Sequence, residues 1–471
     1  KNKKLKLIKN IDVLSLEHNR SNTLYVGTKK GMYYLKNGKL FRYSPNTLKS
    51  NDFNKIPVND IEFIDKYEIW YATFGQGLFL QDLGTIQNFD KNDGLKSGGM
   101  VFDMVNWKGK TYIATKNGLF VFSGGNISKH YKKEQGLPSN IILDMDTYDG
   151  LDFIWLATSN GISKFDGTSF INYSKNLGLP AKLVTAIHVD RTKSNTVWTG
   201  SEKSGLTRFD DNGFFNFATQ DGLPSNSIRD ITQSKNGDLI IACYNAGVVK
   251  YDGKTFKLFN NGLADKRVIL VTNGPDGSIW AGTESAGVGV LNDDQFKMVI
   301  DADGLGHNEI FSLHYDGKRM WAGTFGGGVS CFSDDIWYTM SQADGLASSN
   351  VGAIISSKGK ILLGGNNGLS IFEENDAQFA LKFDKILTPK AEIPFQASMS
   401  TLAGIINDRF FMTANAMVYN PADAQVRYRY KTIKDGESSS WSKPQLSSQI
   451  SFVPNEVGNF QFQVQAIDNR L

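Results

Sequence analysis

A five-residue apolar phrase returns nine times along the chain, about every 42 residues. A copy has in most cases an apolar residue, then a position that is usually Trp or Tyr, an apolar residue or Thr, then Ala or Gly, and usually a closing Thr. A period of about 40 to 45 residues with several short strands per copy is typical of a β-propeller. The copies end at Thr28, Thr73, Thr115, Thr158, Ser201, Cys243, Thr283, Thr324 and Gly365.

Turn residues divide each copy into four short strands. In residues 221–259 the Asn-Gly and Asp-Gly pairs separate apolar runs, and such pairs favour two-residue hairpins because they tolerate positive φ. A recurring Gly-Leu turn, such as Gly222-Leu223, is interpreted as the joint between one blade and the next. The strands predicted in this copy are Ser227–Gln233, Leu239–Cys243, Val248–Tyr251 and Thr255–Phe259.

The second strand of most copies is apolar on both faces, which predicts that neighbouring sheets cover both faces. Its large ring, as in Trp155, Trp198 and Trp280, stands two residues before Ala or Gly and therefore shares a face with it. A bulky side chain beside a gap lets adjacent blades interlock. We interpret these tryptophans as core residues and not as a platform for a ligand.

Nine copies exceed the usual four to eight blades of a propeller. Residues Leu5–Ile8 precede the first copy and could supply an outer strand that pairs with the last blade. We therefore expect an all-β chain with one closed ring of about nine four-stranded blades over residues 1–376. The alternative is a ring of seven or eight blades with copies left over.

The period stops after Phe372, and the remaining strands are of another kind. The last of them reads FQFQVQAI, a two-residue alternation expected of a sandwich strand with one buried face. We predict a small immunoglobulin-like β-sandwich over residues 377–471, and a truncated sandwich without its final strand is one alternative. Its predicted strands include Arg409–Met412, Val426–Lys431, Gln449–Val453 and Phe460–Ile467.

Charge and composition limit the function. The formal net charge is +3, from 51 basic and 48 acidic residues, and no long basic run occurs, so a nucleic-acid or anionic-membrane footprint is not supported. No run of about 18 apolar residues occurs, so no membrane span is expected inside this chain. Cys243 and Cys331 fall in different repeats and are expected to be two buried free thiols.

The repeat phrases resemble a known family. QGLPSN (135–140), DGLPSN (221–226), FDG (165–167) and IWAGT (279–283) look like the two-component regulator propeller repeat. RYRYK (427–431), Trp441, ISF (450–452) and FQFQVQAIDN (460–469) are similar to the Y_Y_Y domain that follows such propellers. Many relatives carry two seven-bladed rings, and nine copies do not make that arrangement.

This resemblance implies an extracytoplasmic sensor region of a bacterial, often hybrid, histidine kinase, located in the periplasm. Such sensors commonly recognise glycan fragments, so the expected partner is an oligosaccharide or another small polar ligand, with a possible homodimer as a second expectation. No cofactor and no nucleic acid are implied. The membrane would be reached only through a segment outside this chain.

Propeller topology places the joints between blades and the turns between second and third strands at one end of the ring. Residues at these positions vary in type while the framework repeats. Aromatic, carboxylate and guanidinium groups there would suit a sugar or other small polar ligand, although many such residues simply face solvent. The candidate ligand-binding residues are Phe74, Glu202, Arg229, Tyr244, Arg267, Glu284, His307, Glu309 and Phe325.

Catalysis is not expected. None of the five histidines has metal-ligand spacing such as HExxH, and no GxSxG turn occurs, so neither a catalytic residue nor a metal site is predicted. Two alternatives to a sensor remain open. One is a periplasmic or surface scaffold of a secretion apparatus, and the other is a propeller lyase or hydrolase.

Overall fold

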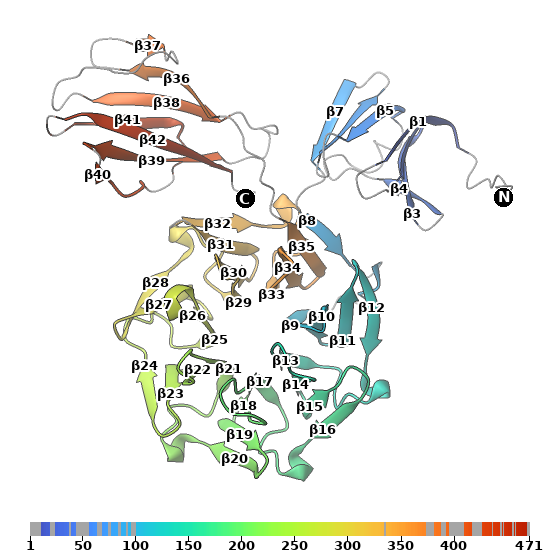
Figure 1. Ribbon diagram of the computed structural model, residues 1–471, viewed down its shortest axis with the longest axis vertical. Coiled ribbons are helices and arrows are strands. Elements are labelled where there is room, and N and C mark those ends of the chain that lie inside the picture. The colour runs from blue at the N-terminus through green and yellow to red at the C-terminus, as the bar shows by residue number, and fades with distance from the viewer. Residues whose placement is uncertain are drawn as a thin grey trace. The chain divides into compact units, whose positions relative to one another are not determined.

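The computed structural model describes residues 100–333 and 336–373 without interruption. Outside them it describes residues 11–18, 24–36, 39–43, 56–63, 68–73, 77–82, 86–90, 93–95, 381–387, 392–394, 409–416 and most of 426–468. Regular structure in these residues consists of β-strands and a few single-turn 3-10 helices (Figure 1). The all-β prediction is confirmed.

Seven four-stranded sheets form a ring (Figure 1). Their first strands contact one another in turn, and β33 contacts β9, so the circle is closed. Six of the sheets are antiparallel meanders of four consecutive strands. These are β9 (Val101–Trp107), β10 (Lys110–Thr115), β11 (Gly118–Ser123), β12 (Asn126–Tyr131); β13 (Ile142–Asp146), β14 (Ile154–Thr158), β15 (Gly161–Phe165), β16 (Phe170–Tyr173); β17 (Val184–Val189), β18 (Val197–Ser201), β19 (Leu206–Asp210), β20 (Gly213–Phe217); β21 (Ile228–Gln233), β22 (Leu239–Cys243), β23 (Gly247–Tyr251), β24 (Phe256–Phe259); β25 (Val268–Asn273), β26 (Ile279–Thr283), β27 (Val288–Asn292), β28 (Gln295–Val299); and β29 (Ile310–Tyr315), β30 (Met320–Thr324), β31 (Val329–Ser333), β32 (Ile336–Met340).

The seventh sheet closes the ring with a strand from far earlier in the chain. It contains β33 (Val351–Ser357), β34 (Lys360–Gly365), β35 (Gly368–Glu373) and, as its outer strand, β8 (Ile86–Phe89). Asn88 Nδ2 donates a hydrogen bond to the Gly345 carbonyl (2.7 Å), and Ser370 Oγ donates one to Asn88 Oδ1 (2.7 Å). Phe89 joins a buried cluster that also contains Val101 of the next sheet.

The expectation of one ring of nine units is therefore wrong, and the seven-blade alternative is right. All nine copies do form sheets of the repeat type, but β8 pairs with β35 and so closes the circle after seven of them. The proposed closing strand, Leu5–Ile8, lies outside the described residues. Contacts divide the chain between residues 87 and 88, within β8. The predicted boundary at 376–377 lies in a stretch that is not described.

The other two copies form sheets in the first unit, residues 1–87. One has four strands and the other three, because its fourth strand is β8 of the ring. Within this unit β1 and β2 contact β5. The strands are β1 (Val13–His18), β2 (Leu24–Thr28), β3 (Gly31–Lys36), β4 (Lys39–Tyr43), and β5 (Val58–Phe63), β6 (Glu68–Thr73), β7 (Gly77–Asp82).

Blades interlock through the small residue of the repeated phrase. A Cβ built on Gly200 would lie 2.4 Å from Ile228 Cγ2 of the next blade, and one on Gly364 would lie 2.5 Å from Val101 Cγ1. The glycine thus leaves the space that the neighbouring first strand fills. Trp155, Trp198, Trp280 and Trp321 are at most 5% exposed, which confirms them as core residues.

Five joints of the ring contain a single 3-10 turn followed by glycine. These turns are η2 (Lys133–Gln135), η3 (Lys175–Leu177), η4 (Thr219–Asp221), η6 (Asp301–Asp303) and η7 (Gln342–Asp344), whereas η5 (Pro275–Gly277) lies between β25 and β26. The glycine after η4, Gly222, has φ of 93°, a conformation that other residues rarely adopt. The predicted joints are therefore confirmed.

The C-terminal segment forms two sheets. They contain β37 (Glu392–Pro394), β36 (Leu381–Leu387), β38 (Phe410–Ala416), β41 (Gln449–Phe452), and β40 (Glu437–Ser438), β39 (Val426–Lys434), β42 (Phe460–Asp468). Phe452 of one sheet packs edge-on against Phe462 of the other, with ring centroids 4.7 Å apart. Along β42, Gln461 and Gln463 are exposed while Phe462 and Val464 are part-buried, as the alternation predicted.

Both cysteines are buried and form no disulfide, as predicted. Cys243 ends β22, and Cys331 lies within β31. Burial raises the pKa of the Cys243 thiol to about 12. Within the described part of the chain, no helix is long and apolar enough to cross a bilayer.

Candidate functional site

The turns between second and third strands differ in length around the ring. The closing Thr of the phrase fixes the shorter form, since Thr115 Oγ1 donates to the Gly118 carbonyl (2.9 Å) across two intervening residues. It also fixes the longer form, since Thr283 Oγ1 donates to the Gly287 carbonyl (2.8 Å) across three. Four consecutive blades have the longer turn, which begins with Glu202, Tyr244, Glu284 and Phe325. All four are candidate residues.

These turns lie beside the joints. The backbone N–H of Tyr244 donates to the Ser227 carbonyl (2.9 Å), that of Glu284 to Arg267 (3.0 Å), and that of Phe325 to Glu309 (3.1 Å). Turn and joint residues therefore meet at one end of the ring, as propeller topology predicted. We call this end the joint face.

Five candidates form one continuous chain across three blades, which we call the charged arc. It consists of Glu202, Arg229, Tyr244, Glu284 and Arg267. Arg229 Nη2 lies 3.6 Å from Glu202 Oε1, and its guanidinium stacks 4.7 Å from the centroid of the Tyr244 ring. Tyr244 Oη donates a hydrogen bond to Glu284 Oε2 (2.8 Å). The same oxygen forms an ion pair with Arg267 Nη1 (2.6 Å).

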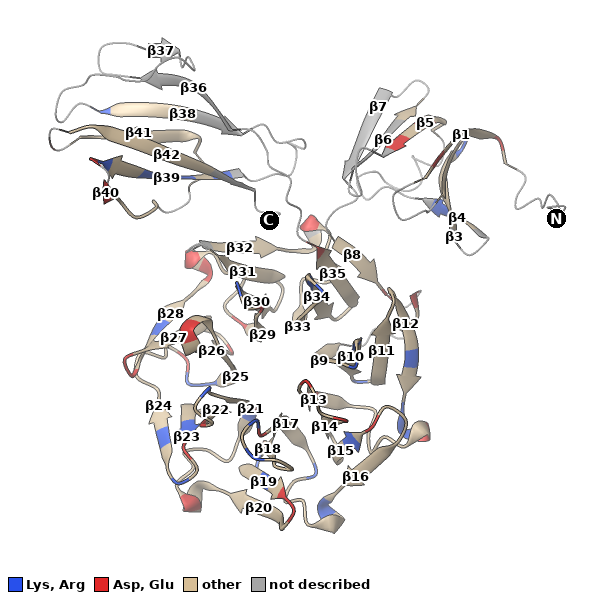
Figure 2. Ribbon diagram, viewed as in Figure 1, with Lys and Arg blue, Asp and Glu red and all other residues tan. Residues whose placement is uncertain are grey.

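Hydrogen bonds and ion pairs fix the position of Arg267 at one end of the charged arc. Arg267 donates to both oxygens of Asp265, from Nε and Nη2 at 2.9 Å each. Burial alone would raise the pKa of Asp265. The hydrogen bonds from Arg267 and Ser285 outweigh burial and keep this pKa below its usual value. The hydrogen bond to Glu284 raises the pKa of the Tyr244 phenol. Charges of both signs are spread around the ring, so local pairing defines the charged arc (Figure 2).

Of the remaining candidates, three belong to the blade of β29–β32 and its joint, and one lies outside the described residues. Phe325 is 45% exposed, and its ring packs edge-on against Phe311, 5.5 Å between centroids. The His307 ring turns to its own loop, where Nδ1 accepts the Glu309 N–H (3.1 Å). Phe74 lies outside the described residues.

Sequence reasoning missed Asp265 and Phe311. Asp265 stands two residues before Arg267, a spacing that could have indicated the bidentate pair. Phe311 follows the first residue of its strand, where the pairing register shifts between Ile310 and Ser312. Such a β-bulge redirects a side chain, but its place in the strand cannot be read from residue types alone.

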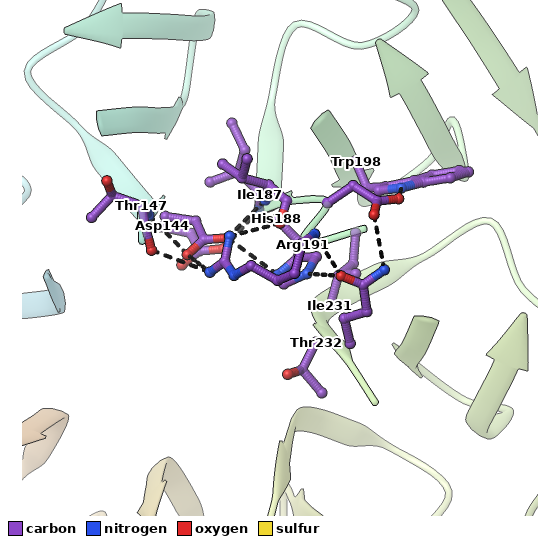
Figure 3. Close-up of polar contacts among 12 residues, drawn as sticks. Asp144, Thr147, Ile187, His188, Arg191, Trp198, Ile231 and Thr232 are labelled. Atoms are coloured by element: carbon purple, nitrogen blue, oxygen red, sulfur yellow. Dashed lines mark hydrogen bonds and ion pairs between the residues drawn. The ribbon is translucent and has the colours of Figure 1, made fainter. Parts of the chain in front are cut away.

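A second polar cluster lies at the opposite end of the ring, where first strands end (Figure 3). Asp146 Oδ1 accepts from Arg191 Nη2 (2.6 Å), and Asp146 Oδ2 lies 3.2 Å from His188 Nδ1. Gln233 Oε1 accepts the Arg191 backbone N–H (2.7 Å), and its Nε2 donates to Asp190 Oδ1 (3.1 Å). These groups join three successive blades to one another.

Inner-strand aspartates tie three of the blades to the next one in a related way. Asp103 Oδ2 accepts the Met145 N–H (2.9 Å), Asp144 Oδ2 accepts that of Ile187 (2.7 Å), and Asp230 Oδ2 accepts that of Val271 (2.8 Å). Burial raises the pKa of Asp103 to about 7 and also raises those of Asp144 and Asp230. No group of His, Cys, Asp and Glu within the described ranges could hold a metal ion.

Comparisons with known proteins agree with this architecture. Residues 422–470 match the Y_Y_Y domain family, which confirms the resemblance of these last strands to that domain. The start of the domain at residue 377 stays a prediction. A search of curated proteins found no match.

Among solved structures, the fold resembles the extracellular domain of the hybrid two-component system BT3049 from B. thetaiotaomicron. The identity is 22% and the TM-score 0.64, over 97% of this chain and 66% of that one. The extracellular domain of BT4673 from the same organism is similar at 17% identity and a TM-score of 0.55, over 96% and 67%. The chain thus spans about two thirds of their length.

Virginiamycin B lyase from Staphylococcus aureus shares the fold at 13% identity and a TM-score of 0.51, over 62% of this chain and 99% of that one. The likeness to a lyase and to extracellular domains together shows a propeller fold that hosts different activities.

Proposed function

We propose that the chain is the ligand-sensing, extracytoplasmic part of a membrane-bound two-component sensor, and that its ligand binds at the joint face. A ring of repeat blades followed by a Y_Y_Y segment supports this proposal, as does the likeness in fold to extracellular domains of two-component systems. The periplasm of a bacterium is the compartment that fits such a sensor.

The observation that carries the proposed ligand site is the charged arc. Five of the candidate residues, predicted from their type and their place in the repeat, contact one another across three blades. Their side chains stay partly accessible: those of Glu202, Arg229, Glu284 and Arg267 are 43%, 31%, 35% and 42% exposed. Arginine, carboxylate and phenol groups, with the exposed Phe325 ring in the next blade, offer hydrogen bonds and an apolar surface to a glycan fragment or similar polar ligand.

Signalling would pass through the C-terminal sandwich. A ligand can bias two arrangements of a homodimer only by binding one of them more tightly. Solution scattering of the dimer with and without ligand tests this step, and identical sandwich separations in the two states would contradict it.

The ligand site is tested by thermal shift of the 471-residue chain against a panel of neutral and acidic oligosaccharides. A ligand at about 100 times its Kd should stabilise the protein by about 2.7 kcal/mol, a rise in Tm of roughly 3 to 5 °C. Tyr244→Ala should remove this rise.

Tyr148→Ala is the matched control. Tyr148 also stacks under an arginine, Arg191, at 4.9 Å, but it belongs to the opposite end of the ring. An oligosaccharide that stabilises the wild type and Tyr244→Ala equally would show that its site lies elsewhere.

A further inference from the structure

The two arginines of the charged arc, Arg267 and Arg229, differ in how many hydrogen-bond partners their guanidinium groups have. Arg267 has partners for all of its guanidinium nitrogens: Asp265 for Nε, Asp265 and Ser285 for Nη2, and Glu284 for Nη1. Arg229 has one carboxylate contact in the described structure, at 3.6 Å from Glu202 Oε1, beyond hydrogen-bond distance. Its Nε is buried and has no hydrogen-bond partner among the described residues.

A β-bulge places Arg229. The register of β21 against β22 shifts between Ile228 and Asp230, so Arg229 is the extra residue of the bulge. The other six ring sheets have the same shift at the same repeat position. Bulges redirect side chains and are common beside binding sites. Arg229 is the one charged residue in this series, whose other members are Phe102, Leu143, Thr185, Ile269, Phe311 and Gly352.

The Tyr244 ring orients the guanidinium group. A guanidinium group held over a ring face keeps N–H donors available to an acceptor, and because Nε is buried these are the Nη donors. A carboxylate or a sulfate offers two oxygens in the geometry that this edge prefers. Exposed Lys203 and Lys266, in the adjoining turn and joint, add positive charge at the joint face.

We propose that Arg229 is the residue of this site that recognises an anionic group, so that the ligand carries a carboxylate or a sulfate. Arg267, already saturated, positions Glu284 and does not take part in anion binding. This inference rests on the proposed ligand site at the joint face and specifies what that site selects.

The test uses three sugars that differ in one group: glucose, glucuronate and glucose 6-sulfate. Binding to the 471-residue chain is measured by ligand-observed NMR and calorimetry at low ionic strength, because salt weakens exposed charge pairs. Glucuronate or glucose 6-sulfate should bind at least 10-fold more tightly than glucose, and the stronger of the two identifies the anion. Arg229→Gln should weaken that binding at least 10-fold, whereas Arg229→Lys should retain part of it.

Arg208→Gln is the matched control. Arg208 also stacks on an aromatic ring, Phe215 at 4.4 Å, and its side chain is 29% exposed against 31% for Arg229. It lies in β19, away from the joint face, and its Nε is 2.9 Å from Asp210 Oδ2. This variant should lose no affinity, and both variants should keep the wild-type Tm.

Three results would overturn the inference. They are equal affinity for glucose and the two anions, no binding of either anion at tens of millimolar, and unchanged anion affinity in Arg229→Gln. If Tyr244→Ala still abolishes binding of an oligosaccharide, the ligand site stands and only the choice of an anion is wrong. Failure of the Tyr244→Ala test instead removes the site itself.

Discussion

At the joint face Arg229 stacks on Tyr244, and at the opposite end Arg191 stacks on Tyr148. The surroundings of the two arginines differ. Arg191 donates from Nη1 to the Val189 carbonyl and from Nη2 to Asp146 and the Thr147 carbonyl, so it links two blades by several short bonds (Figure 3). Arg229 has only the loose contact with Glu202 within the described residues. An arginine stacked on a tyrosine therefore links blades at the opposite end. At the joint face the same arrangement leaves Arg229 available to a ligand.

The carboxylates that pair with these arginines also differ between the two ends of the ring. Asp146 is 15% exposed and accepts hydrogen bonds from the backbone of Thr147 and of Val189 besides its ion pairs. Glu284 of the charged arc is 35% exposed. Because exposed ion pairs contribute little to stability and buried ones cost much when broken, equal substitutions at the two ends should have unequal effects.

Asp146→Ala should have the largest effect on stability. The change removes the carboxylate that pairs with Arg191 and His188 and accepts the Val189 N–H, so we expect a loss of about 3 kcal/mol. Urea unfolding at pH 7 measures it. Asp146→Asn, which keeps an oxygen for the Val189 N–H, should lose less. A loss under about 1 kcal/mol for the alanine variant would show that this end does not hold the ring together.

Much of the fold could be predicted from the sequence because the repeated five-residue phrase determines how neighbouring sheets pack. An apolar second strand with a tryptophan two residues before a glycine, as at Trp198 and Gly200, requires a sheet on each side. Ring closure could not be predicted in this way. Residues Ile86–Phe89 resemble any other outer strand, and only a pairing with residues nearly three hundred positions away decides that they close the seventh blade.

The candidate site was predictable in its positions but not in its contacts. The length of the turns that begin with Glu202 and Tyr244 can be read from the sequence, as can their place at the joint face. The stacking of Arg229 on Tyr244 and the bond from Tyr244 to Glu284 depend on a β-bulge and on the spacing of neighbouring blades. Neither leaves a signature in one sequence.

Asp103→Asn should have the second largest effect, and it should depend on pH. Burial raises the pKa of Asp103 from 3.8 to about 7, so between these values the folded protein binds more protons than the unfolded chain. The contribution of Asp103 to stability therefore falls as pH rises from about 4 to 7. An asparagine can still accept the Met145 N–H and carries no charge. The variant should lose part of this slope and gain on the order of 1 to 2 kcal/mol at pH 8 relative to the wild type.

Urea midpoints of both proteins from pH 4 to pH 8 give this measurement. Asp252→Asn is the control, because hydrogen bonds in its exposed turn lower the pKa of Asp252 instead of raising it. If the curves of the wild type and Asp103→Asn stay parallel through this range, the assignment of a strained carboxyl to the inner strands is wrong.

Glu284→Ala should have the smallest effect on stability, about 0.5 kcal/mol or less, because the side chain is partly exposed. Its effect on Tyr244 should nevertheless be clear. The hydrogen bond to Glu284 is the main cause that raises the pKa of the Tyr244 phenol, so its loss should lower that pKa toward 10. The titration is followed by NMR of ring-labelled tyrosine, with Tyr244→Phe used to assign the signal. An unshifted phenol would mean that the charged arc is not connected in solution, and the joint face would then lack the preformed contacts that set it apart from the opposite end.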